Sequence, residues 1–236
     1  MKVVIHQPQY FPYPGFFHKL IMADALVILD NTQYDKRFTN RNKIWTPHGF
    51  TWLTVPIKKE HKFLPNKNVE INNDINWREE HWKKIFHSYS KAKYFPKYKE
   101  YFEKIYKKEW KYLCQLNVET LEKIIDFLGI KIKIIKETEL NIEGTSTQRL
   151  VNCCQAIGAD TYISGRGLPN KKYIDEKLFL KNNVKLIYQD YEPMTYQQIV
   201  SNHFESDLSI IDMLFNIGPE SLTLITKSSK IHNIEK

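Results

Sequence analysis

The chain has 236 residues, of which 42% are hydrophobic and 14% aromatic, and this length favours one α/β domain with a smaller helical insertion. Its formal net charge of +8 suits a nucleic-acid partner only if the lysines cluster on one surface of the protein. Many of them fall in residues 83–111, where lysines alternate with aromatic residues at near-helical spacing. This pattern favours amphipathic helices with a solvated basic face, so we expect no nucleic-acid partner; a basic, aromatic nucleic-acid surface is the alternative.

The cysteines and the hydropathy exclude further classes of protein. Cys153 and Cys154 are adjacent and Cys114 stands alone, which is neither a disulfide framework nor a zinc-binding spacing. We therefore expect a reduced, cytoplasmic protein with no metal site. Residues 3–5 are too few for the apolar part of a signal peptide, and no apolar run approaches the ~18 residues of a membrane span. The sequence predicts a soluble protein without membrane insertion.

The first informative stretch is residues 3–19. Three apolar residues predict a buried strand that ends near His6, because the prolines that follow lack an N–H group and fix φ. From Gly15 onward apolar residues recur at helical spacing, which predicts a helix with His18 and Lys19 in its first turn. Cations beside the exposed N–H groups of a helix start suit an anion such as a phosphate. The sequence therefore predicts an anion or nucleotide site here.

A second strand and a polar loop follow. Residues 23–30 predict a strand that carries Asp30 at its carboxyl end, the edge on which open α/β sheets bind ligands. Residues 31–43 predict a long polar loop in which Arg37, Arg41 and Lys43 suit phosphate or carboxylate groups. A solvated, charged turn is the alternative interpretation of the same loop.

The middle of the chain reads as a hairpin followed by helices. Residues 44–56 favour a β-hairpin that turns at residues 47–49, and residues 58–68 are polar and expected to be exposed. Helical patterns cover residues 77–90, 96–109 and 113–128, the last ending at Gly129, a suitable C-cap.

The last part returns to α/β alternation. Strands are predicted at residues 130–135 and 184–188, and helices at residues 148–157 and 209–216, with Asp207, Ser209 and Asp212 as capping residues of the second helix. Between them, a short strand opens into Ser164-Gly165-Arg166-Gly167. Glycines let backbone N–H groups approach a ligand closely, although a plain tight turn is the alternative.

Five motifs, taken in order, resemble the WbqC-like family: HQPQYFPYPGFFHKL, ADALVILDNTQYDKRFTNRNKI, WLTVPI, GADTYISGRGLPNKKYID and FESDLSIIDMLFNIG. Members are typically bacterial and encoded among genes for surface polysaccharide, lipopolysaccharide and O-antigen assembly, and some carry a glycine transferase label. The resemblance extends, distantly, to the nucleotidyltransferase-like α/β superfamily that includes pantothenate synthetase. It implies a Rossmann-like parallel sheet of nucleotidyltransferase-like (HUP-type) topology, with residues 1–72 and 130–226 as a discontinuous α/β domain and residues 73–129 as a helical subdomain.

The resemblance also implies where ATP would bind. In that superfamily, two histidines near a helix start and a late Ser/Lys loop hold ATP and its phosphates. Here His6 and His18 flank the first loop, with eleven residues between them rather than the HxGH spacing. Ser164, Arg166, Lys171 and Lys172 occupy the position of the late loop.

The leading functional hypothesis is an ATP-dependent acyl transfer. A small carboxylic acid or amino acid such as glycine is adenylated with ATP and Mg²⁺, and the amine of a nucleotide-linked amino sugar attacks. The expected catalytic residues are His6, His18, Asp30 and Arg166. The expected substrate-binding residues are Gln7, Gln9, Tyr10, Lys19, Gln33, Tyr34, Lys36, Arg37, Asn40, Arg41, Ser164, Gly165, Gly167, Lys171, Tyr173 and Gln197.

Two alternatives stay open at this point. The first keeps the transfer but uses an acyl-thioester or aminoacyl donor without ATP. The second is a non-catalytic protein that binds a nucleotide sugar or serves as a scaffold in a glycan-assembly complex. The sequence leaves the oligomeric state open.

Overall fold

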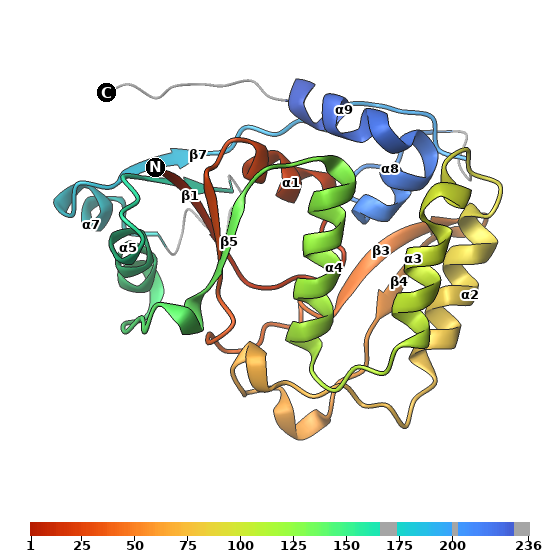
Figure 1. The fold of residues 1–236 in the computed structure, drawn as a ribbon, viewed down its shortest axis with the longest axis horizontal. Helices are drawn as coiled ribbons and strands as arrows, with labels where there is room; N and C mark the ends of the chain where they lie inside the picture. Colours follow the sequence, from red (N-terminus) through yellow and green to blue (C-terminus); the bar gives the residue numbers. More distant parts are fainter. Residues whose placement is uncertain (166–173, 200–202, 229–236) are drawn as a thin grey trace.

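The computed structural model describes residues 1–165, 174–199 and 203–228, and its centre is a five-stranded parallel β-sheet (Figure 1). The sheet strands are β1 (Lys2–His6), β2 (Ala25–Ile28), β5 (Lys133–Lys136), β6 (Thr161–Ser164) and β7 (Lys185–Tyr188). Their order is β5-β2-β1-β6-β7, so the order reverses direction at β1. This is the arrangement of a Rossmann-like sheet, and it confirms the predicted fold class.

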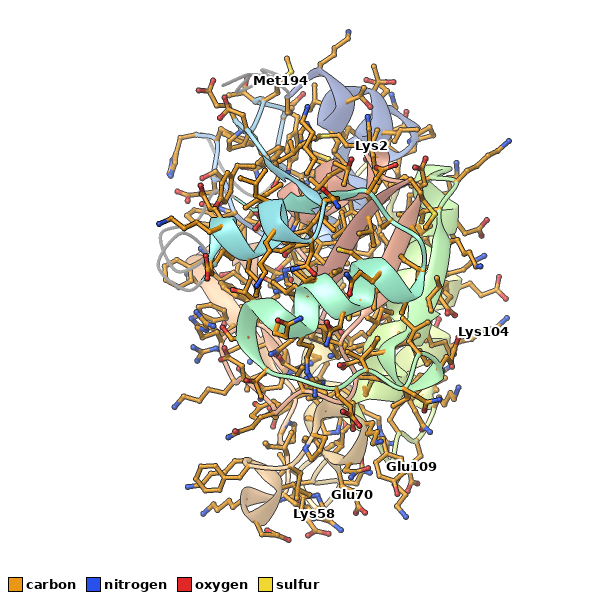
Figure 2. The ribbon with its side chains drawn as sticks, turned by 90° about the vertical axis from the view of Figure 1, so that its left-hand side faces the viewer. Lys2, Lys58, Glu70, Lys104, Glu109 and Met194 are labelled. Atoms are coloured by element: carbon orange, nitrogen blue, oxygen red, sulfur yellow. The ribbon has the colours of Figure 1, made fainter. Side chains whose placement is uncertain are left out.

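Helices cover both faces of this sheet. They are α1 (Pro14–Ile21), α2 (Trp77–Tyr89), α3 (Phe95–Lys107), α4 (Leu113–Leu128), α5 (Ser146–Ala156), α7 (Glu176–Lys181), α8 (Ile210–Ile217) and α9 (Ser221–Lys227). Figure 1 shows α5 and α7 on the left of the sheet and α4 on its right, with α2 and α3 farther right. In the side view of Figure 2, α5 and α7 lie in front of the strands.

The apolar residues of each strand divide between these two layers because successive side chains point to opposite faces. Val4 and Leu26 belong to the larger core, which includes α1, α4 and the helices of residues 77–107. Val3 and Val27 belong to the smaller core with Cys154 of α5 and other residues of α5 and α7. Strands buried on both faces read as continuous apolar runs, which is why residues 3–5 were recognisable. The helices of the predicted insertion share the larger core with the sheet.

An antiparallel hairpin, formed by β3 (Arg41–Thr46) and β4 (Gly49–Thr54), lies beside the sheet. The predicted turn is confirmed at residues 47 and 48, whereas Gly49 is already the first residue of β4. The predicted polar loop of residues 31–43 ends earlier than expected. Arg41 pairs with Thr54 in the ladder, so the strand starts at Arg41. Short 3₁₀ helices η1 (Lys59–His61) and η2 (Asn66–Asn68) follow, and η3 (Glu137–Glu139) and η4 (Gly218–Glu220) come later.

The first helix also differs from the expectation. It begins at Pro14, because proline suits the first helical turn, where an N–H group would have no partner. His18 and Lys19 therefore lie in its last turn, where the helix dipole favours cations. The predicted phosphate site at the N–H groups of this helix start is accordingly not formed by these two residues. In the described ranges, no helix is both long and apolar enough to cross a bilayer.

Candidate functional site

The carboxyl ends of β1 and β6 lie side by side at the reversal point of the sheet, and we call the place between them the crevice. His6 is the last residue of β1, and Ser164 is the last of β6, which pairs with β1 in parallel. Open α/β sheets bind their ligands at this point, because the chains leaving the two strands run to opposite faces. Ser164 is buried, with 1% of its surface exposed, and Gly165 follows it. The predicted site residues Arg166, Gly167, Lys171 and Tyr173, together with Lys172, lie outside the described residues.

His6, at the end of β1, carries an unprotonated ring nitrogen. Its ring is half-buried against the edge of Phe16, with 5.1 Å between ring centroids. Nδ1 lies 3.0 Å from the carbonyl oxygen of Gln7, which can only accept a hydrogen bond, so the ring hydrogen sits on Nδ1. Nε2 then carries a lone pair. Burial and, secondarily, the Lys19 cation lower the pKa of His6 to about 3, so the imidazole is neutral at physiological pH.

Lys19 is a buried cation beside His6. Only 5% of its surface is exposed, and its Nζ lies 5.6 Å from the centroid of the Phe16 ring. Burial lowers the pKa of Lys19 to about 8, so it is still largely protonated at pH 7. Within the ranges that the structure describes, no carboxylate or other hydrogen-bond acceptor pairs with its ammonium. A buried charge is costly unless it is paired, and an anionic ligand would supply the missing partner.

His18 is held inside the fold by Gln189, which directly follows β7. The Nε2 of Gln189 donates to the carbonyl oxygen of Gly15 at 2.7 Å and lies 2.8 Å from Nδ1 of His18. Because the Gly15 carbonyl can only accept, the amide nitrogen is fixed, and it donates its second hydrogen to His18. The hydrogen of His18 therefore sits on Nε2. Burial lowers the pKa of His18, and Asp190 acts in the opposite direction. This arrangement ties α1 to the ends of β6 and β7.

Sequence reasoning missed Gln189. The signal available for it was its position, immediately after the carboxyl end of a predicted parallel strand. Its backbone N–H also donates to the carbonyl oxygen of Ser164 at 2.7 Å. Gly15 is equally constrained, because a Cβ there would lie 2.4 Å from the Tyr13 ring and 2.7 Å from the Tyr191 ring. Together these contacts fix the position of α1 against the ends of β6 and β7.

Asp30 lines a separate cleft of about 600 Å³ at the ends of β2 and β5. Its carboxylate accepts hydrogen bonds from the backbone N–H of Thr138 at 3.1 Å and from the Thr138 hydroxyl at 2.7 Å. Charges of both signs line this cleft. The other lining residues are Lys67, Lys108, Glu109, Trp110, Cys114, Gln115, Val118, Glu119, Glu122, Lys136 and Thr138. Such walls suit a zwitterionic or amine-bearing molecule better than an anion.

Four predicted substrate-binding residues meet in a second pocket of about 330 Å³ beside the hairpin, which we call the hairpin pocket. Its lining residues are Tyr34, Lys36, Asn40, Arg41, Thr54, Ile57, Lys59 and Lys62. Sequence reasoning assigned residues 58–68 to an exposed polar segment and so missed Lys59 and Lys62. The reason is that η1 folds back beside the hairpin, a tertiary contact that no local pattern encodes.

The other predicted residues are distributed more widely. Tyr10 is fully buried, with its hydroxyl 2.6 Å from that of Tyr106 and 3.1 Å from Nδ1 of His81, so its polar group serves the core. The guanidinium of Arg37 is paired with Asp35. Gln7 and Gln9 are half-buried after β1, whereas Gln33 and Gln197 are exposed.

Asp212 on α8 is a buried acceptor of several hydrogen bonds, a hub, rather than the capping residue that the sequence suggested. It has no exposed surface, and its carboxylate accepts from the Tyr89 hydroxyl at 2.8 Å, the Tyr196 hydroxyl at 2.7 Å and Nε2 of Gln198 at 3.0 Å. Burial raises the pKa of this carboxyl, and the hydrogen bonds act against that rise. Ser209 is the true N-cap, accepting from the N–H of Ile211.

Replacing Asp212 with Asn is expected to lower the free energy of unfolding by about 2–4 kcal/mol, because an amide nitrogen cannot accept the bonds on one side of this hub. Urea denaturation of the two proteins measures the difference. Asp126→Asn is the matched control, since Asp126 pairs with Lys123 on the surface and such pairs contribute about 0–1 kcal/mol. Equal losses in the two variants would contradict the hub assignment.

Comparisons with known proteins show which family the chain belongs to. The model of the WbqC-like protein family matches residues 7–224. The chain is 32% identical over 222 residues to "Uncharacterized protein Rv1507c" of Mycobacterium tuberculosis (strain ATCC 25618 / H37Rv), an alignment that covers 93% of this chain and 95% of the relative. No solved structure matches the chain. A family match and a relative that both extend over almost the whole chain show that the protein belongs to the WbqC-like protein family.

Proposed function

We propose that this protein transfers a small acyl or aminoacyl group, with glycine as the first candidate, to the amino sugar of a nucleotide-linked precursor in bacterial surface-glycan biosynthesis. The transfer proceeds through an acyl-adenylate made from ATP. The single observation that carries the proposal is Lys19, a buried cation without an acceptor among the described residues, beside the neutral His6 at the reversal point of the sheet. Membership of the WbqC-like family supports the role in glycan biosynthesis.

The chemistry of the crevice fits this reaction. In the first step, a carboxylate oxygen of the acid attacks the α-phosphorus of ATP, and pyrophosphate leaves. The Lys19 ammonium offsets the negative charge that develops on the phosphates, which is the main requirement of such transfers. The described residues hold no cluster of three or more His, Cys, Asp or Glu side chains suited to a metal, so Mg²⁺ would be held through phosphate oxygens.

In the second step, the amine nitrogen attacks the acyl carbon, the bond to the phosphate oxygen breaks, and AMP leaves. The amine must lose a proton, and we assign its acceptance to the lone pair of His6 Nε2. Lys19 is one cause of the low pKa of His6, so an anion that neutralises Lys19 raises the basicity of His6.

The test is the release of pyrophosphate by the purified protein. We expect release that depends on ATP, the acid and the amino-sugar nucleotide together, with one amide formed per pyrophosphate. If the protein instead forms the amide from an aminoacyl thioester and releases no pyrophosphate, the donor is the thioester and the acyl-adenylate is rejected.

The second candidate function is non-catalytic binding of a nucleotide sugar within a glycan-assembly complex. The hairpin pocket favours it, because the residues that line this pocket include neither His6 nor Lys19. Binding of a nucleotide sugar without turnover of any donor would support this candidate.

A further inference from the structure

The cations of the hairpin pocket lack partners, whereas their neighbours in the sequence have them. Lys36, Arg41, Lys59 and Lys62 line the pocket, and in the described ranges none of them forms an ion pair with a carboxylate. Beside them, Arg37 pairs with Asp35, and Lys58 pairs with Glu70 at 2.5 Å. Figure 2 shows Lys58 and Glu70 together at the lower end of the molecule. The positive charge is thus left uncompensated on the wall of the pocket.

Arg41 is fixed in a binding geometry. Its guanidinium carbon lies 4.5 Å from the centroid of the Trp52 ring, and its Nε donates to the carbonyl oxygen of Arg37 at 3.2 Å. These two contacts leave the terminal nitrogens without an acceptor among the described residues. A planar guanidinium held in this way binds two oxygens of a phosphate with little further loss of conformational freedom.

Two neutral polar groups share the wall. Asn40 is 7% exposed and its Nδ2 donates to the carbonyl oxygen of Val55 at 2.8 Å, which leaves Oδ1 as a buried acceptor without a partner. Tyr34 is 7% exposed, and burial, more than Asp35, raises the pKa of its hydroxyl to about 12, so it stays a donor. The pocket therefore combines phosphate-binding cations with two neutral polar side chains, Tyr34 and Asn40, in its wall.

Aromatic side chains stand exposed beside the cations. Phe38 is 44% exposed and packs on Trp52 with 6.5 Å between ring centroids. Phe63 is 70% exposed and lies beneath Nζ of Lys62, 4.8 Å from the ring centroid. Exposed rings next to phosphate-binding cations are the elements that stack on a nucleic-acid base.

We propose that the hairpin pocket binds a nucleoside diphosphate, with the diphosphate on Arg41 and the lysines and the base against Phe38 or Phe63. The observation that carries this is the group of unpaired cations around an arginine already fixed by Trp52. Identification of the bound molecule as the nucleotide-linked acceptor rests on the proposed function, but the binding itself does not. Free nucleic acid, the other polyanion that such a surface attracts, is an outcome of the test.

The experiment is calorimetric titration of the full chain with UDP, dTDP, CDP and GDP, without ATP or acceptor. We expect at least one to bind more tightly than its nucleoside or inorganic pyrophosphate alone. We expect Arg41→Gln and Lys62→Gln each to weaken that binding about tenfold, which corresponds to one strong charged contact. Lys58→Gln is the matched control, because it removes the same charge nearby from a residue that does not line the pocket; its Kd should stay within twofold.

Three results would overturn the proposal: no binding of any of the four nucleotides at millimolar concentration, a change below threefold in both pocket variants, or tighter binding of a random-sequence oligonucleotide than of every nucleoside diphosphate. Lys19→Met separates this proposal from the proposed function. It should lose turnover and keep its nucleoside-diphosphate Kd within twofold. Loss of that binding in Lys19→Met, with Arg41→Gln unaffected, would place the nucleotide in the crevice instead and reject the hairpin pocket.

Discussion

Replacing Lys19 with Met is expected to lower turnover at least about 100-fold while it raises the melting temperature. The loss follows because a preorganised charge on the reacting phosphates contributes about 10²–10³ in rate. The gain follows because Met has a similar shape but no charge to bury, and removing an unpaired buried charge relieves a cost of a few kcal/mol. Initial rates of pyrophosphate release and thermal unfolding of the same samples measure both effects.

Lys104→Met is the control, because Lys104 lies on the surface in an ion pair with Glu100, and neither rate nor melting temperature should change appreciably. A Lys19→Met protein that is less stable than the wild type and equally active would contradict the assignment. The opposed directions of the two effects make the test specific, since a merely structural lysine would lose stability and activity together.

The same lysine gives stability a definite pH dependence. The folded pKa of Lys19, about 8, is lower than the ordinary 10.5 of the unfolded chain. Between these values the unfolded chain binds more protons, so the free energy of unfolding rises as the pH rises through this window. The raised pKa values of the buried Cys114, Cys153 and Cys154 act in the opposite direction in both proteins, so the expected result is a difference. The free energy of unfolding of the wild type should rise relative to that of Lys19→Met as the pH increases from 7 to 10, measured by urea denaturation. Identical slopes for both proteins would contradict the low pKa.

Replacing His6 with Phe is expected to lower turnover about 10²–10⁴-fold, the usual contribution of a positioned acid or base. Phe keeps the edge contact with Phe16 and removes the Nε2 lone pair, so the fold should stay intact by circular dichroism. His87→Phe is the control, because His87 is exposed on α2 and lies outside the crevice. A His6→Phe enzyme with wild-type rates would remove His6 from the mechanism.

The pH profile of the wild type distinguishes the state of His6. The pKa of His6 in the free protein is about 3, so His6 stays neutral between pH 7 and 5. Over this range, kcat/KM should therefore change with pH in the same way in the wild type and in His6→Phe. A fall near pH 6.5 that disappears in the variant would mean that His6 is not desolvated as the structure has it.

Much of the fold was predictable because its signals are local. The buried parallel strands read as apolar runs, and Gly129 ends α4 in the left-handed conformation with φ of 71°, as a C-cap glycine should. Element ends were harder to predict. Pro14 was interpreted as part of a break between strand and helix, but it is the first residue of α1. Proline is compatible both with a loop and with the first turn of a helix.

The site was less predictable because its partners are distant in the chain. Asp212 bonds to Tyr89, which is 123 residues away, and His18 is oriented by Gln189, which is 171 residues away. Lys19 was selected from the sequence as a cation of a helix start, yet its importance comes from burial without a partner, which only the fold produces. Tyr34, Lys36, Asn40 and Arg41 were chosen as one polar segment, and the structure brings them together with Lys59 and Lys62.

The proposed function requires Lys19 to bind a phosphate group of ATP in the crevice between β1 and β6. A crystal structure of the full chain with a non-hydrolysable α,β-methylene ATP and Mg²⁺ would show where the phosphates lie. We expect a phosphate oxygen within ion-pair distance of the Lys19 ammonium, beside His6. A nucleotide bound elsewhere, with Lys19 still lacking an anionic partner, would contradict it.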